Sequence, residues 1–284
     1  MRQLDASRVQ SIQCPRCAYQ AASLIDLETH GLHAHARAKE ARPHLSTQER
    51  YQGLRPSVQP EEPVAAGQWP SALTIPEPDP TFWVERHVSR FLDAMGRRLQ
   101  DGDVVNVLLV GPTGTGKSSL PQEFAAAWRR PFFSMHCQLV TEQGDWWGTR
   151  EMSMERGTYF QKAALLDAVE TPGCVILLDE ANRTHPENLN ALFGFLDHRR
   201  KAWIPALQRE VAVAPGVAFF VTLNEGGDYV GTNAVDRAFR DRLSGTVRLV
   251  YLPMEVESSL LVRRTGIDER GARGLSEFAN TVRH

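Results

Sequence analysis

The stretch Gly111-Pro-Thr-Gly-Thr-Gly-Lys117-Ser118 decides the fold, because it follows the apolar run 104–110 and precedes a helix-like stretch, 119–129. A strand, a glycine-rich turn and a helix in this order form a loop whose backbone N–H groups point at phosphates. Lys117 then places a positive charge beside the β- and γ-phosphates of a nucleotide, and the Ser118 hydroxyl is available to Mg²⁺. The residues expected to bind the nucleotide here are Gly111, Pro112, Thr113, Gly114, Thr115, Gly116, Lys117, Ser118 and Ser119.

A second motif is Gly173-Cys-Val-Ile-Leu-Leu-Asp179-Glu180, in which Asp179 lies 62 residues after Lys117. Its apolar run predicts a strand buried in a parallel sheet, and the carboxyl end of such a strand is where ligands bind. We expect Asp179 to hold Mg²⁺ through water and Glu180 to polarise the water that attacks the γ-phosphate. The two motifs together predict binding and hydrolysis of a nucleoside triphosphate.

The composition fits one α/β domain with a small appendage. The 284 residues are 42% hydrophobic, which is enough for one large core. A formal net charge of −2 argues against a general polyanion-binding protein. No apolar run approaches the roughly 18 residues of a membrane span, and the first five residues lack the apolar core of a signal peptide. We therefore expect a cytoplasmic protein without a membrane partner, in which Cys137 and Cys174 are buried thiols.

Composition also divides the chain into segments. Residues 1–42 carry a cysteine pair and a histidine cluster, and residues 43–80 are proline-rich, which predicts an extended, mobile linker. Over residues 81–252, expected strands and helices alternate, which predicts a parallel sheet with helices on both faces. The expected strands are 104–110, 131–137, 174–179, 217–223 and 246–251, and the expected helices are 81–100, 118–129, 160–170, 186–198 and 233–242.

Two further stretches follow these motifs at characteristic spacing. Asp179-Glu-Ala-Asn-Arg183 continues the acidic strand end, and the strand-like run that ends in Asn224 lies 45 positions after Asp179. With the stretch from Asn224 to Leu243, this order resembles P-loop ATPases of the AAA+ class, in the MoxR and dynein/midasin-related branch, over residues 85–262. The resemblance implies that Asn224 is a sensor 1 residue, which orients the attacking water and reports loss of the γ-phosphate.

The resemblance also implies that an arginine reaches the nucleotide site of the next subunit. Arg240 and Arg242 are the two candidates, since a guanidinium stabilises charge on a transferring phosphoryl group. We favour Arg242 from its place in the R-x-R-L pattern, although the sequence does not separate the two. The alternative is a helix end whose arginines interact with nearby carboxylates or with the helix dipole.

Two insertions and the mode of assembly are further implied by the resemblance. The segments 148–160 and 200–215 resemble β-hairpins that line one face of a ring and engage partners in this branch, and the alternative is a pair of long surface loops. The family implies ATP as the nucleotide and a homo-oligomeric ring, expected to be a hexamer. It also implies a client or an adaptor protein, for which a von Willebrand A-type protein is the candidate.

The end of the chain departs from the family pattern. After Leu252-Pro-Met the family has a helical lid with a sensor 2 arginine, but only about 30 residues remain here. We therefore expect residues 253–284 to form the start of an incomplete lid, with helices at 255–264 and 273–283. Arg263, Arg264 and Arg273 are candidate substitutes for the missing arginine, without a pattern that separates them.

The N-terminal segment matches the spacing C-x2-C-x12-H-x4-H through Cys14, Cys17, His30 and His35. This spacing predicts a ββα zinc finger in which four ligands close a structural Zn²⁺ site, and the metal stabilises a segment too short for its own core. His33 competes with His35 as the fourth ligand but fits a helix less well, and an unmetallated helix is the alternative to a finger. Few cations occupy the base-facing positions, so we expect the finger to bind protein rather than nucleic acid.

Taken together, the sequence predicts a Mg²⁺-dependent ATPase ring that remodels or activates a partner protein, similar to MoxR-like chaperones. One alternative is a nucleic-acid-directed motor subunit of a restriction or defence system, as in the McrB-like GTPases of the same branch. Another is a nucleotide-binding structural subunit with little turnover, because the lid is short.

Overall fold

The computed structural model describes residues 50–60, 70, 72–155, 157–224 and 236–283, together with the backbone of two short strands near the N-terminus. The chain divides into two compact units, Met1–Ser46 and Thr47–His284. In the first unit, β1 (Ile12–Gln13) pairs antiparallel with β2 (Gln20–Ala21). Cys14, Cys17, His30 and His35 lie outside the described residues, so the zinc finger stays a prediction.

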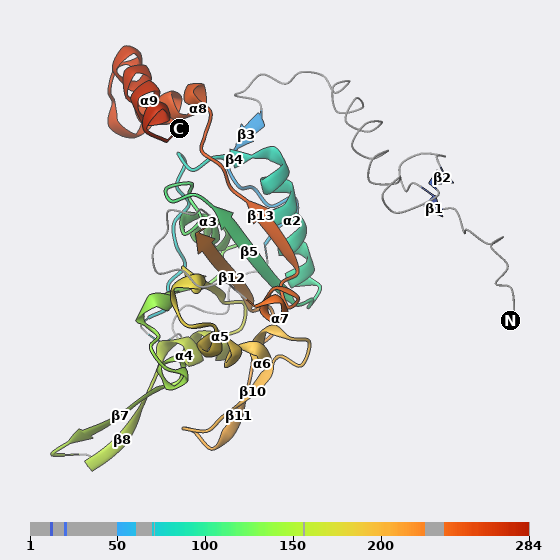
Figure 1. Cartoon of the computed structure of the whole chain (residues 1–284), viewed down its shortest axis with the longest axis vertical. Helices are drawn as coiled ribbons and strands as arrows, with labels where there is room; N and C mark the ends of the chain where they lie inside the picture. The colour runs from blue at the N-terminus through green and yellow to red at the C-terminus, as the bar shows by residue number, and fades with distance from the viewer. Residues whose placement is uncertain are drawn as a thin grey trace, which may run out of the picture. The chain divides into compact units, whose positions relative to one another are not determined.

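A five-stranded parallel sheet forms the centre of the second unit (Figure 1). Its strand order is β13-β5-β12-β9-β6, and all four neighbouring pairs are parallel. The strands are β5 (Val105–Gly111), β6 (Phe132–His136), β9 (Val175–Asp179), β12 (Ala218–Asn224) and β13 (Gly245–Arg248). This arrangement confirms the predicted parallel sheet and its five strands.

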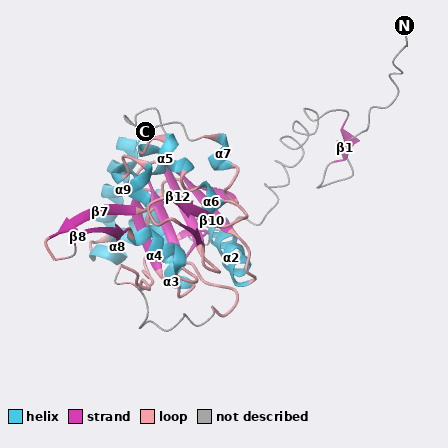
Figure 2. Cartoon of the chain, turned by 90° about the horizontal axis from the view of Figure 1, so that it is seen from below, coloured by secondary structure: helices cyan, strands magenta, loops and turns pink. Residues whose placement is uncertain are grey.

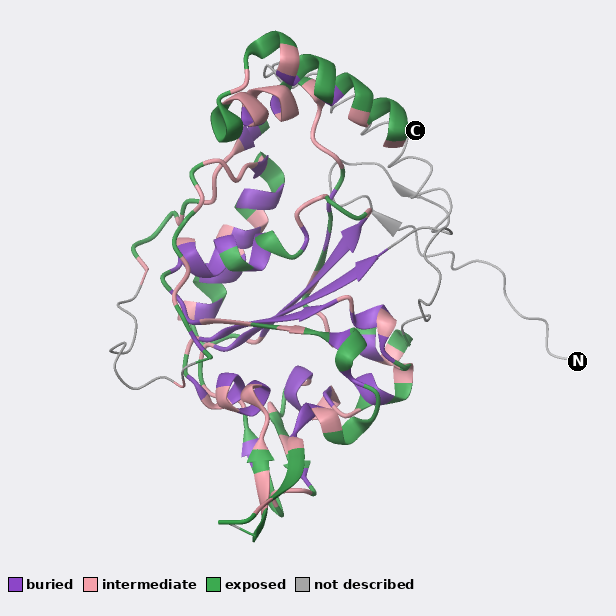
Figure 3. Cartoon of the chain, turned by 90° about the vertical axis from the view of Figure 1, so that its left-hand side faces the viewer, coloured by how far each residue is buried: buried purple, intermediate pink, exposed green. Residues whose placement is uncertain are grey.

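Helices cover both faces of this sheet, and successive residues of each strand face opposite layers. On one face, Val107 and Phe220 pack with α2 (Arg86–Gln100) and α3 (Ser119–Ala127). On the other, Leu108 and Phe219 pack with residues of α4 (Ala164–Glu170), α5 (Pro186–Asn190) and α6 (Phe193–Leu196). All residues of β5, β9 and β12 are buried as a result, as the purple strands of Figure 3 show.

Two antiparallel hairpins extend from this unit. They are β7 (Gly148–Ser153) with β8 (Gly157–Lys162), and β10 (Lys201–Ile204) with β11 (Arg209–Ala212). In Figures 1 and 3 both hairpins lie at the end of the unit opposite to α8 (Met254–Thr265) and α9 (Glu269–Arg283). Figure 2 shows β7 and β8 standing out from the body. The predicted hairpins are therefore present, although β8 continues to Lys162 and replaces the first turn of the helix expected at 160–170.

Other predicted elements differ in their bounds. The helix expected at 81–100 begins only at Arg86, because β4 (Val84–Glu85) pairs antiparallel with β3 (Tyr51–Gln52). The helix expected at 186–198 is divided into α5 and α6, and of the helix expected at 233–242 the described residues contain α7 (Arg237–Arg240). Short 3-10 helices occupy η2 (Cys137–Leu139), η3 (Gln143–Trp146) and η4 (Ala181–Arg183).

The described part of the proline-rich segment belongs to the second unit and packs against its helices and sheet rather than forming an extended linker. Tyr51 is buried beside Val256 and Leu260, and the backbone N–H and hydroxyl of Ser57 both donate to the Asp93 carboxylate. Thr74 forms a β-bridge with Phe132. The mobile linker expected over residues 43–80 is therefore wrong for residues 50–60 and 72–80, while the boundaries proposed at 42, 80 and 252 stay predictions.

The chain ends in two helices, α8 (Met254–Thr265) and α9 (Glu269–Arg283), which pack on each other. Gly266 ends α8 in the left-handed conformation with a φ of 71°, which turns the chain back. Both helices of the expected lid are present, and α9 begins four residues before the predicted start at 273. No described helix combines the length and the apolar composition that a membrane crossing needs.

The packing of α2 against the Trp128 ring can be tested by substitution of a glycine. A Cβ atom on Gly96 of α2 would lie 2.0 Å from the buried Trp128 ring, whereas one on Gly274 of α9 would meet no atom within 4 Å. We predict that Gly96→Ala lowers the free energy of unfolding by about 1–3 kcal/mol through overpacking. Gly274→Ala should raise it by roughly 0.5 kcal/mol, because alanine favours a helix. Urea unfolding measures both, and equal effects would contradict the packing.

Candidate functional site

The glycine-rich loop lies between β5 and the N-terminus of α3, where backbone N–H groups are left without helical partners. Gly111, Gly114 and Gly116 have φ values of 148°, 82° and 86°, which side-chain-bearing residues rarely adopt. A Cβ atom on Gly111 would also lie 2.2 Å from the Leu249 carbonyl oxygen. The loop conformation therefore depends on glycine at these positions, as the sequence motif predicts.

Lys117 is held inside this loop. The residue is 6% exposed, and Nζ donates to the carbonyl oxygens of Gly111 at 2.8 Å and Pro112 at 2.7 Å. The ammonium group therefore lies within the curve of the loop, where a bound phosphate chain would place its negative charge.

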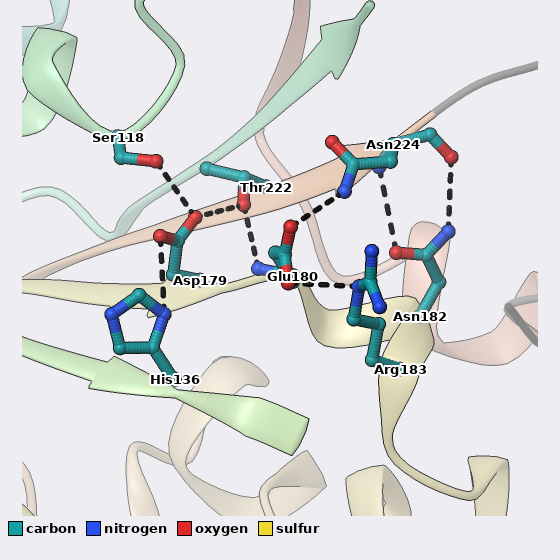
Figure 4. A network of polar contacts seen from close by, with 8 residues as sticks. All are labelled: Ser118, His136, Asp179, Glu180, Asn182, Arg183, Thr222 and Asn224. Atoms are coloured by element: carbon teal, nitrogen blue, oxygen red, sulfur yellow. Dashed lines mark hydrogen bonds and ion pairs between the residues drawn. The ribbon is translucent and has the colours of Figure 1, made fainter. Parts of the chain in front are cut away.

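The Asp179 carboxylate joins the loop to the neighbouring strands (Figure 4). Its Oδ1 accepts hydrogen bonds from Ser118 Oγ at 3.0 Å and from Thr222 Oγ1 at 2.5 Å, and His136 Nδ1 lies 3.5 Å from Oδ2. The Ser118 hydroxyl and the Asp179 carboxylate are hard oxygen donors of the kind that Mg²⁺ prefers. The residues present thus fit a magnesium ion held by Ser118 and Asp179.

Glu180 occupies the turn directly after β9, in the left-handed conformation with φ 52° and ψ 48°. Its backbone N–H donates to Thr222 Oγ1 at 2.7 Å. In the side chain, Oε1 accepts a hydrogen bond from Asn224 Nδ2 at 2.8 Å, and Oε2 lies 2.8 Å from Arg183 Nε as an ion pair. The structure therefore brings the predicted base and the predicted sensor residue into direct contact.

Four residues of this cluster have no role assigned from the sequence, although two of them stand in the stretch 179–183 that carries the family resemblance. Asn182 Nδ2 donates to the Asn224 carbonyl oxygen at 3.0 Å and so ties the end of β12 to the turn. The others are Arg183, Thr222 and His136. Two signals could have identified them. Asn182 and Arg183 lie two and three positions after Glu180 in the chain. Thr222 is a polar residue in an apolar strand, and His136 ends β6 at the carboxyl edge of the sheet.

The two candidate finger arginines have different surroundings. Arg240 is exposed, whereas Arg242 is half-buried, with its guanidinium 4.1 Å from the centre of the Phe193 ring. Arg242 Nη1 also donates to the Ala238 carbonyl oxygen at 2.6 Å. This packing within its own subunit does not support our preference for Arg242 and favours Arg240 as the residue available to a neighbour.

The three arginines of α8 and α9 that the sequence offered as substitutes for a sensor 2 arginine also differ in their contacts. Arg264 Nε donates to Thr81 Oγ1 at 2.7 Å, and Arg263 lies 5.0 Å from the Trp83 ring centre. Arg273 pairs with Glu277 on the surface of α9, with Nε 3.2 Å from Oε1. Arg264 and Arg283 line the cavity beside the loop, and Arg283 was not among the candidates taken from the sequence.

That cavity has a volume of about 240 Å³ and lies beside Gly114, Thr115 and Gly116. Aromatic and aliphatic side chains from the segment before α2 and from the lid form much of its wall, and the Tyr251 hydroxyl donates to the Thr113 carbonyl oxygen at 3.0 Å. Its wall includes Phe82, Trp83, Val84, Tyr251, Leu260 and Leu261. A larger cavity of about 540 Å³ has no residue of the glycine-rich loop in its wall. We therefore take the smaller one as the place for a nucleotide base.

A phosphate-binding loop between strand and helix, beside an acidic strand end, defines the class of P-loop nucleoside triphosphatases. Residues 106–243 match the family described as "AAA domain (dynein-related subfamily)". The chain is also 36% identical over 215 residues to "Putative chaperone BssE" of Thauera aromatica, which covers 75% of this chain and 73% of that protein. The chain belongs to the AAA+ family of P-loop ATPases.

More distant similarities agree with this membership. The uncharacterised protein YojN of Bacillus subtilis is 26% identical over 171 residues, and the match covers 58% of this chain and 54% of YojN. Among solved structures, the Thermotoga maritima RuvB Holliday junction branch migration motor has a TM-score of 0.50 at 18% identity, over 68% of this chain and 56% of RuvB. The similarity to RuvB shows the fold alone.

Thr222 offers a test of the site's internal bonding. Thr222→Val keeps the side-chain volume but removes a donor to Asp179 and leaves the backbone N–H of Glu180 without its acceptor. We predict a loss of about 1–3 kcal/mol in the free energy of unfolding. Thr246→Val, at an exposed position of β13, should change it by less than about 0.5 kcal/mol. Urea unfolding measures both variants. An equally small change in the two would show that the Thr222 hydroxyl does not contribute to the free energy of unfolding.

Proposed function

We propose that this protein is a Mg²⁺-dependent ATPase that converts ATP and water to ADP and phosphate. The observation that carries the proposal is the cluster in which Ser118, Asp179, Glu180 and Asn224 meet beside Lys117. ATP rather than GTP is proposed from the family. The base would lie in the cavity beside the loop, and the phosphates against residues 111–119.

The proposed reaction assigns one task to each residue of the cluster. Lys117 and the loop amides bind the phosphates, while Glu180 accepts a proton from the attacking water. The water oxygen bonds to the γ-phosphorus as the bond to the β,γ-bridging oxygen breaks, and ADP leaves. Asn224 holds the Glu180 carboxylate through Oε1. When bound to Ser118 and, through water, Asp179, Mg²⁺ would neutralise charge on the phosphate oxygens.

Assembly into a ring, which we propose to be a hexamer, would complete each site with an arginine from the neighbour. Arg240 is the better candidate because it is exposed, while Arg242 stacks on Phe193 of its own subunit. A guanidinium delivered in this way stabilises charge on the transferring phosphoryl group. Loss of the γ-phosphate near Asn224 would then also remove the contact with the neighbour's arginine and so change the subunit interface.

The proposed work of the ring is remodelling or activation of a partner protein, in the manner of MoxR-like chaperones. The name of the similar protein BssE contains the word chaperone, which supports this proposal. The hairpins expose Met152, Met154 and Trp203, and apolar side chains at projecting tips suit contact with protein. We propose that these hairpins contact the client, that a von Willebrand A-type protein is the adaptor, and that the ring works in the cytoplasm.

The N-terminal unit is proposed to recruit that client or a scaffold. Cys14, Cys17, His30 and His35 would hold a structural Zn²⁺ ion, which leaves no open position for catalysis. This proposal rests on the spacing of the four residues.

Replacement of Glu180 tests the proposed base. We predict that Glu180→Gln lowers the rate of phosphate release at least about 100-fold, because the amide cannot accept the water proton. Its affinity for ATP should stay close to that of the parent. Glu187→Gln, an exposed change in α5, is the matched control and should keep the parental rate. A Glu180→Gln protein with parental turnover would contradict the assignment, and a parent without turnover would contradict the proposed activity.

Mixed rings test the arginine from the neighbour. Arg240→Ala and Glu180→Gln subunits should each be nearly inactive alone, but a mixture should recover activity, because an intact site can then face an intact arginine. The measurement is phosphate release as a function of mixing ratio. Recovery with Arg242→Ala instead of Arg240→Ala would assign the role to Arg242. Absence of recovery with either variant would contradict completion of the site by a neighbour.

A further inference from the structure

The contacts of the Glu180 carboxylate point to a residue that acts through the proposed base. Arg183 Nε lies 2.8 Å from Glu180 Oε2, three positions along the chain. We propose that Arg183 is a positioning residue that, together with Asn224, fixes the Glu180 carboxylate for hydrolysis. This inference rests on the proposed ATPase function and concerns the same site.

The carboxylate is held from two sides. Asn224 at the end of β12 contacts Oε1 at 2.8 Å, and Arg183 at the end of η4 contacts Oε2 at the same distance. Two contacts on different oxygens restrict rotation of the carboxylate plane, which one contact would leave free. Each carboxylate oxygen has two acceptor sites, so both can still accept a proton from water.

The local backbone builds this clamp. Glu180 has a left-handed conformation that is uncommon for a residue with a side chain, and the Thr222 hydroxyl accepts its N–H at 2.7 Å. The 3-10 helix η4 then turns the chain so that Arg183 faces back towards Glu180 (Figure 4). Asn182, in the same turn, bonds the Asn224 backbone, so both arms of the clamp are anchored to one structural element.

A purely structural role for the ion pair makes a different prediction. The side chains of Arg183 and Glu180 are 33% and 28% exposed, and partly exposed ion pairs contribute little to stability. If stability were its only role, loss of Arg183 would change turnover hardly at all. If Arg183 positions the base, its loss should lower turnover and spare both folding and nucleotide binding.

The experiment uses the full chain and four variants. Arg183→Ala and Arg183→Gln should lower kcat about tenfold, because the base loses one of its two contacts. KM for ATP and the affinity for ATP should stay within about twofold of the parent. Arg183→Lys keeps the positive charge and should recover part of the lost kcat. Arg98→Ala, which removes an exposed ion pair with Asp103, is the control and should keep the parental kcat.

A second measurement separates the possible outcomes. In a Glu180→Gln background, Arg183→Ala should cause no further loss, because Arg183 acts through the carboxylate that is gone. Parental kcat in both Arg183→Ala and Arg183→Gln would overturn the proposal, and so would a loss of ATP affinity as large as the loss of kcat. A parent protein that releases no phosphate would instead overturn the ATPase function itself. Unfolding curves identify any variant that does not fold, and Arg183→Gln then provides the test.

Discussion

The structure depends on the hydrogen bonds that satisfy one buried carboxylate. Asp179 is 6% exposed and accepts bonds from Ser118 of the phosphate-binding loop and from Thr222 of β12. A buried carboxylate without such donors would be strongly destabilising, so the loop, β9 and β12 must keep their register for the site to form. The Thr222 hydroxyl also accepts a hydrogen bond from the backbone N–H of Glu180. The position of the proposed base therefore depends on the same register of β9 and β12.

The segment before α2 and the helix α8 lie around the glycine-rich loop and the helix that follows it. The Arg264 guanidinium in α8 binds Thr81, and the N–H of Asp79 donates to the Glu123 carboxylate in α3, the helix that follows the loop. Burial raises the pKa of Glu123, while the bond from Asp79 opposes that shift. The segment before α2 thus connects the lid to the phosphate-binding helix. Packed side chains rather than a flexible tether therefore join α8 to the helix that follows the loop.

The sequence predicted the parts that depend on local pattern. Apolar runs located the five strands, and the glycine and lysine spacing located the loop, because both follow from backbone geometry. The remainder depends on tertiary contacts. Proline-rich residues 50–60 and 72–80 look like a linker by composition but are packed parts of the second unit. The stacking of Arg242 on Phe193 joins residues 49 positions apart. The clamp of Arg183 on Glu180 was likewise hidden, because it depends on the left-handed turn at Glu180.

Calorimetric titration of ATP tests most directly whether the loop and the β9 carboxylate form one magnesium-dependent triphosphate site. We predict that the parent protein binds ATP in the presence of Mg²⁺ and at least about tenfold more weakly in EDTA, since the ion would link protein and phosphates. Lys117→Ala should abolish binding under both conditions, whereas Lys201→Ala, at an exposed position of β10, should not change it. Parental affinity in Lys117→Ala, or binding that is indifferent to Mg²⁺, would show that the loop and the β9 carboxylate do not form one magnesium-dependent site.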